Sequence, residues 1–192
     1  MTVPMAFEAQ QQLQSELASG ERLLWTGQPR QGIRLRAADA LLIPFSLLWG
    51  GFAVYWEIGV LQDGTAPFMA IFGIPFVCVG LYVTVGRFLV DSYRRARTYY
   101  GLTGQRALIR TPGGIRSVAL RGVADVSLRE ATDGTGTISF GSGNGPQLSF
   151  LVGTSWPGAT RGLPPQFDMI ENARRVYSQI RDAQSALEKV GA

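Results

Sequence analysis

The chain has no histidine and only one cysteine among 192 residues. Without histidine there can be no catalytic triad that uses an imidazole base and no metal site that uses an imidazole ligand. The single cysteine, Cys78, cannot form an internal disulfide and is too few for a zinc cluster. We therefore expect a protein that is not an enzyme and that holds no cofactor or metal.

The catalytic options that this inventory leaves open are chemistry by carboxylates alone and serine–lysine chemistry. Five acidic residues outside the apolar segments occur on alternating strand faces, in turns or at the start of a helix: Asp91, Asp125, Glu130, Asp133 and Asp168. Their spacing offers no defined pair of general acid and base. An enzyme that uses these carboxylates at a membrane surface is the least favoured of three alternatives.

Lysine is almost absent as well, since the 18 basic residues are 17 arginines and Lys189. The formal net charge of +4 is concentrated beside two apolar runs. A nucleic-acid-binding protein would spread its positive charge over one face of a domain. We therefore expect no nucleic-acid partner.

The sequence does contain two long apolar runs, residues 40–60 and 67–90, separated by only six residues. As helices that rise about 1.5 Å per residue, both are long enough to cross about 30 Å of bilayer hydrocarbon. The only charges within them are Glu57 and Arg87, and each lies near an end of its run. The pattern predicts a transmembrane hairpin over residues 39–91.

The arginines around the hairpin predict its orientation. Three precede the first run and three follow the second, namely Arg30, Arg34, Arg36, Arg94, Arg95 and Arg97, whereas the linker between the runs has no basic residue. By the positive-inside rule the protein is a two-pass protein of the cell (inner) membrane with both termini in the cytoplasm. The same arginines could instead contact anionic lipid headgroups, with about 1 kcal/mol for each.

The polar parts, residues 1–38 and 92–192, are read as one small α+β unit. Before the hairpin we expect a helix over Met5–Ser19 and a short strand over Glu21–Gly27. After it, short segments punctuated by glycine predict six strands, at 98–102, 106–110, 115–120, 124–129, 137–140 and 148–152. In the fourth of these, alternation places Ala124, Val126 and Leu128 toward the interior.

The chain then ends in a predicted amphipathic helix that begins near Pro164-Pro165 and runs to about Lys189. The positions of its predicted stripe recur at steps of three and four residues: Phe167, Ile170, Ala173, Tyr177, Ile180, Gln184 and Leu187. A stripe of this width is suited to covering the open end of a β-barrel.

Three short segments carry a resemblance to a known family. They are Gly20–Pro29 (GERLLWTGQP), Tyr100–Ile109 (YGLTGQRALI) and Gly134–Gly141 (GTGTISFG). With them, the chain resembles bacterial membrane proteins that carry a pleckstrin-homology-like (PH-like) domain. The resemblance implies a small PH-like β-barrel capped by the C-terminal helix, with the hairpin inserted between two pairing strands. In eukaryotic members the loop between the first two strands often binds phosphoinositides, and in this chain the hairpin stands in place of that loop. The resemblance therefore implies no phosphoinositide site in this chain.

The leading hypothesis is a non-enzymatic, membrane-tethered module that presents a protein- or lipid-binding surface at the cytoplasmic face. Its expected partners are the bilayer, with anionic headgroups as candidates, and a protein that the sequence does not identify. The alternative is a small oligomeric channel or transporter-associated subunit, packed through the small pairs Ser46/Gly50 and Ala66/Ala70. The absence of an ionisable residue at mid-membrane depth disfavours that alternative.

Overall fold

The structure is a computed structural model that describes residues 3–32, 39–64, 67–131, 134–141 and 164–190. It divides into two compact units. Of the described residues, the sheet unit comprises 3–32, 93–131, 134–141 and 164–190, and the hairpin unit comprises 39–64 and 67–92. The chain is thus an α+β protein with two long apolar helices and two antiparallel sheets.

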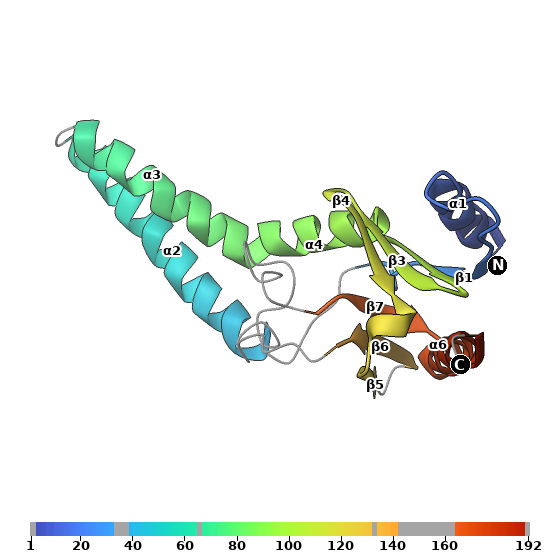
Figure 1. Cartoon of the computed structure of the whole chain (residues 1–192). Helices are drawn as coiled ribbons and strands as arrows, with labels where there is room; N and C mark the ends of the chain where they lie inside the picture. The colour runs from blue at the N-terminus through green and yellow to red at the C-terminus, as the bar shows by residue number, and fades with distance from the viewer. Residues whose placement is uncertain (1–2, 33–38, 65–66, 132–133, 142–163, 191–192) are drawn as a thin grey trace. The chain divides into compact units, whose positions relative to one another are not determined.

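The two apolar runs form the two long helices of the hairpin unit (Figure 1). Helix α2 spans Asp39–Asp63, and α3 spans Pro67–Leu81 before a π-helical turn, η1 (Tyr82–Gly86), and helix α4 (Arg87–Ala96). Both helical stretches are long and apolar enough to cross a membrane, and only 11% of the most apolar window of each is buried. The second stretch continues six residues beyond the predicted end at residue 90.

Small residues allow α2 and α3 to approach closely. A Cβ atom added at Gly80 would lie 2.9 Å from the Gly50 Cα atom, which leaves no room for a side chain at the crossing. One turn away, the Thr84 hydroxyl donates to the carbonyl oxygens of Gly80 (2.7 Å) and Ser46 (3.4 Å). The predicted Ser46/Gly50 pair therefore packs against Gly80 and Thr84 of the same chain. Of the second predicted pair, Ala66 lies outside the described residues.

The first sheet joins the segment before the hairpin to the strands after it. Its strands are β1 (Leu23–Gly27), β2 (Tyr99–Thr103), β3 (Arg106–Thr111) and β4 (Gly114–Ala119), in that order across the sheet. Strand β1 pairs antiparallel with β2, with Leu23 opposite Thr103 and Gly27 opposite Tyr100. The prediction that the segment before the hairpin pairs with a strand after it is confirmed.

The second sheet has the order β5 (Val126–Glu130), β6 (Thr135–Phe140) and β7 (Gln166–Glu171). In the described part of the chain no strand pairing links this sheet to the first, so the two do not form a closed barrel. The prediction for Ala124 is wrong, because the 3₁₀ turn η2 (Leu120–Gly122) follows β4 and pairing starts only at Val126. Ala124 is exposed and Val126 is buried.

Strand β7 corrects the predicted start of the last helix. Phe167 lies opposite Ile138 and Ile170 opposite Gly136, with a bulge between the two pairs. The bulge brings two residues three apart to the same buried side, which imitates a helical repeat in the sequence. The helix α6 spans Ala173–Val190, after Asn172, and the predicted strand at 148–152 lies outside the described residues.

One apolar core lies among both sheets and α6 (Figure 1). Phe167 is its hub, fully buried, with its ring centroid 5.6 Å from that of Trp25, 4.9 Å from that of Tyr100 and 5.0 Å from that of Phe140. The buried stripe of α6 consists of Ala173, Val176, Ile180, Ala183 and Gln184. Helix α1 (Val3–Gln14), shorter than predicted, buries Ala9 and Leu13.

Candidate functional site

Arg95 lies at the place where the chain returns to the sheet unit, and its side chain points inward. The residue is only 6% exposed. Its Nη2 donates to the Gly32 carbonyl at 2.7 Å, and its Nη1 lies 3.5 Å from the Arg30 carbonyl and 3.7 Å from the Met169 sulfur. The guanidinium therefore holds backbone carbonyls of the segment that leads away from β1.

The same segment is held by further hydrogen bonds. The Gln31 side-chain amide donates to the carbonyl oxygens of Arg95 (3.2 Å) and Pro29 (2.6 Å), and the Arg30 amide donates to the Met169 carbonyl (2.9 Å). Met169 has a φ of 50°, a left-handed conformation that is uncommon for a side chain of this size. The chain thus leaves and re-enters the sheet unit at neighbouring points that β7 also contacts.

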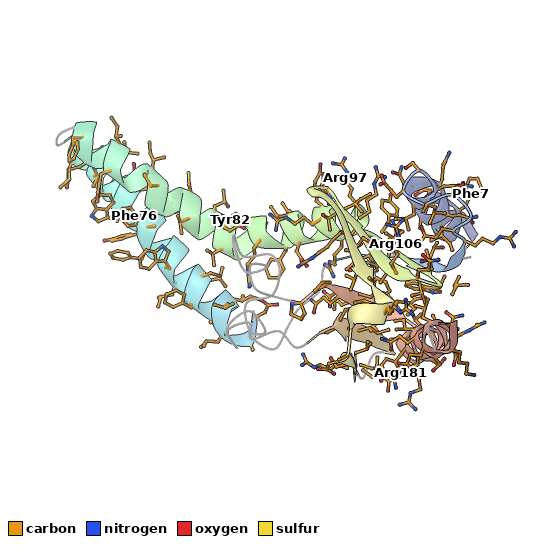
Figure 2. The ribbon with its side chains drawn as sticks, in the orientation of Figure 1. Phe7, Phe76, Tyr82, Arg97, Arg106 and Arg181 are labelled. Carbon is orange, nitrogen blue, oxygen red and sulfur yellow. The ribbon has the colours of Figure 1, made fainter. Side chains whose placement is uncertain are left out.

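The other predicted membrane-proximal arginines occupy different environments. Arg94 is exposed on α4 and Arg97 is exposed directly after it, and the Arg97 guanidinium lies 4.0 Å from the centroid of the Tyr93 ring, a cation–π contact. Arg30 is half-buried, and Arg34 and Arg36 lie outside the described residues. The structure thus brings Arg30 and Arg95 together and leaves the side chains of Arg94 and Arg97 accessible; Arg97 is labelled in Figure 2.

Two of the segments that carry the family resemblance meet at one ion pair. The Glu21 carboxylate accepts from Arg106 Nε (2.9 Å) and Nη2 (2.7 Å), from the Thr103 hydroxyl (2.8 Å) and from the Ala18 amide (2.9 Å). These hydrogen bonds, with Arg106 as the main donor, lower the pKa of the Glu21 carboxyl to about 2. The motif residues therefore clamp the start of β1 to the β2–β3 corner (Figure 2 labels Arg106).

The buried phenol of Tyr100 also has a defined partner. The Asp168 amide donates to the Tyr100 hydroxyl oxygen at 3.2 Å. Burial, with a smaller contribution from the Asp168 carboxylate, raises the pKa of the Tyr100 phenol above its ordinary value. A neutral phenol in this position packs in the core and is poorly placed to act as a base.

The described residues contain no group of three histidine, cysteine or acidic side chains that could hold a metal ion. Several of the acidic side chains are instead engaged by arginines of the same unit. Glu130 accepts from Arg174 at 2.6 Å, and Glu16 lies 3.6 Å from Arg110. These pairs connect neighbouring elements, and they lie near the surface.

The hairpin unit contains an ion pair that sequence reasoning missed. Arg87 Nη1 lies 2.6 Å from the Asp39 carboxylate, and both side chains are almost fully buried. The Val83 carbonyl, in the π-helical turn η1, also accepts from Arg87 Nε at 2.8 Å. The sequence did carry a signal for this pair. The start of the first helix and the end of the second lie side by side in an antiparallel hairpin, and these two ends carry the opposite charges of Asp39 and Arg87.

The outer face of the hairpin is rich in aromatic side chains. Ring contacts run from Phe45 through Trp49, Phe76 and Phe72 to Phe68, with centroid separations of 5.3 to 6.4 Å. Beside this row is an apolar groove of about 200 Å³, lined by Trp49, Phe52, Ala53, Trp56, Phe72 and Phe76. Figure 2 labels Phe76 within this row.

Comparison of the chain with protein-family models, with curated proteins and with solved structures finds no match.

Proposed function

We propose that this protein is a membrane-tethered, non-enzymatic binding module. In this proposal the hairpin crosses the inner membrane of a bacterium, both termini lie in the cytoplasm, and the sheet unit is a PH-like domain that presents a protein-binding surface at the membrane. Two sheets of four and three antiparallel strands followed by one amphipathic helix support the PH-like assignment. The positive-inside distribution of arginine supports the orientation.

The observation that carries the proposal is the insertion of the hairpin between two paired strands. Strand β1 ends at Gly27 and its neighbour β2 begins at Tyr99, and the helices α2, α3 and α4 lie between them in the sequence. Arg95 holds the outgoing segment through the Gly32 and Arg30 carbonyls. A domain that is tethered through both ends of one strand connection is suited to presenting a surface at the bilayer.

A lipid contact is the second candidate, and the exposed pair Tyr93 and Arg97 favours it. Aromatic and arginine side chains next to a membrane span often lie at the level of the headgroups. Arg94, which is also exposed, adds a second positive side chain at this position. In this proposal Arg95 does not contact lipid, because its guanidinium is committed to carbonyls inside the sheet unit.

Site-specific photocross-linking in living cells tests the binding function. A photoreactive amino acid at Ser127, exposed on β5, samples the sheet face, and one at Tyr55, exposed on α2, samples the hairpin as a matched control. We expect a discrete adduct of defined mass from the sheet unit. If no position over the surface of the sheet unit gives a protein adduct, the protein-binding function is wrong.

The lipid contact is tested by exchanging lipids around the full chain. Nanodiscs with and without phosphatidylserine should give different hydrogen exchange in α4, and R94Q/R97Q should remove the difference. A difference that persists in the double variant would assign the effect to other residues.

A further inference from the structure

A polar groove of the sheet unit lies between the turn η2 and the C-terminal half of α6. Its volume is about 300 Å³, at the lower end of the range for ligand sites. Two arginines from different elements line it, Arg121 from the turn and Arg181 from the helix. Figure 2 labels Arg181 on α6.

A buried glutamine fixes both walls of this groove. Gln184 is only 8% exposed, and its side-chain amide donates to the carbonyl oxygens of Leu120 (3.2 Å) and Val123 (2.9 Å), on either side of the turn. Its side-chain oxygen accepts from Arg181 Nη1 at 3.3 Å. One side chain in the apolar stripe of α6 therefore both holds the turn that carries Arg121 and orients Arg181.

The chemistry of the lining indicates the class of ligand. In the described part of the chain neither Arg121 nor Arg181 pairs with a carboxylate, whereas Arg106 and Arg174 do. Guanidinium groups recognise carboxylates through two parallel hydrogen bonds. The half-buried Val123 and Leu187 lie in the same lining and can contact an apolar group next to the anion.

We propose that this groove binds an acidic peptide segment of a partner protein. A carboxylate side chain of the segment meets Arg121 and Arg181, and a neighbouring apolar side chain packs on Val123 and Leu187. Glu188 is the one acidic residue of the lining, so it opposes the ligand's charge and limits how many carboxylates the groove accepts. The inference rests on the proposed function, because it names the chemistry of the partner.

Fluorescence polarisation with the full chain in phosphatidylcholine nanodiscs tests the proposal. The probes are a fluorescein-labelled octapeptide of alternating glutamate and leucine and its counterpart with glutamine in place of glutamate. We expect saturable binding of the acidic peptide. The glutamine peptide should bind with an affinity that is lower by about tenfold or more. R121Q and R181Q should each weaken acidic-peptide binding several-fold, and E188Q should strengthen it.

The control is R116Q, which removes an exposed arginine of β4 outside the groove and should leave binding unchanged. No saturable binding up to about 1 mM peptide, or equal binding by the R121Q/R181Q double variant, would overturn the proposal. Attachment to phosphatidylserine vesicles that depends on these arginines, without peptide binding, would also overturn it, in favour of a lipid surface. Failure here with a protein adduct from Ser127 would leave the proposed function standing and exclude only this site.

Discussion

Glu21 and Arg106 are joined by two hydrogen bonds, of 2.9 Å to Nε and 2.7 Å to Nη2, across 85 residues of sequence. The Glu21 side chain is 6% exposed. Because Glu21 precedes β1 and Arg106 begins β3, the pair fixes the strand before the hairpin to the sheet built after it.

This pair makes the stability of the sheet unit depend on pH. The pKa of Glu21 falls from its ordinary value of 4.5 to about 2 on folding, so its contribution is complete above pH 4.5 and is lost as the pH falls from 4.5 towards 2. We expect E21Q to lower the free energy of unfolding by about 1–3 kcal/mol at pH 7. The difference between E21Q and the unmodified chain should shrink at pH 3, measured by thermal unfolding in detergent.

The matched control for that experiment is E130Q. Glu130 pairs with the exposed Arg174, where water screens the interaction. We expect this variant to unfold at the same temperature as the unmodified chain. An equal loss of thermal stability in both variants would show that the two hydrogen bonds between Glu21 and Arg106 stabilise the fold no more than the exposed pair does.

Phe167 should be among the most costly core positions to truncate. Its ring contacts three aromatic side chains from other strands, so F167A leaves a cavity and should cost about 3–5 kcal/mol. Denaturant unfolding in detergent measures the loss. F7A, which truncates a side chain that is 65% exposed, should change stability by less than about 0.5 kcal/mol.

The crossing of α2 and α3 should depend on the absence of a side chain at Gly80. A Cβ atom there would approach the Gly50 Cα atom to 2.9 Å, so G80V should separate the helices. In a C78S background, oxidative cross-linking of an S46C/T84C pair should become several-fold slower. G51V adds the same side chain where no atom lies within 4 Å of the new Cβ, and its cross-linking should be unchanged.

Removal of the Arg95 guanidinium should loosen the segment after β1. R95M removes its hydrogen bond to the Gly32 carbonyl, and a hydrogen bond to a charged group contributes about 1.5–3 kcal/mol. Hydrogen exchange over residues 28–32 should become faster, while membrane insertion is retained. R97Q removes an exposed arginine instead and should leave that exchange unchanged.

The proposed orientation predicts opposite labelling of two single cysteines in a C78S background. D63C lies at the end of α2 beside the turn, and S127C lies on β5. A membrane-impermeant maleimide applied to intact cells should label D63C and not S127C, and cell lysis should expose both. Labelling of S127C in intact cells would show that the proposed orientation is wrong.

Much of this fold is predictable from local patterns because the periodicity of the apolar residues is strong. The two apolar runs and the hairpin of β2 and β3 follow from spacing. The stripe of α6 follows only in part, because Ala173, Ile180 and Gln184 are buried as predicted, whereas the buried Val176 and Ala183 were missed. The bulge in β7 is not predictable in this way, because Phe167 and Ile170 have a helical spacing and face one side only once β6 is paired. Ala124 fails for a related reason, since η2 displaces the start of the strand.

The candidate sites depend more on tertiary contacts than on local pattern. Arg95 cannot be distinguished from Arg94 and Arg97 in the sequence, and only the packing of the returning chain shows which of the three turns inward. Gln184 likewise reads as a member of an apolar stripe. Its hydrogen bonds to the carbonyls of Leu120 and Val123 come from a turn more than 60 residues earlier.

The pairing of β1 with β2 has a consequence for biosynthesis. Leu23 and Thr103 are neighbours in the sheet but are 80 residues apart in the chain, and both apolar helices are made between them. During translation β1 therefore emerges without its partner and must wait until the whole hairpin has left the ribosome. In the proposed topology, insertion of the hairpin into the membrane comes before closure of the first sheet. A fragment that starts after the hairpin lacks the edge strand β1 from the outset.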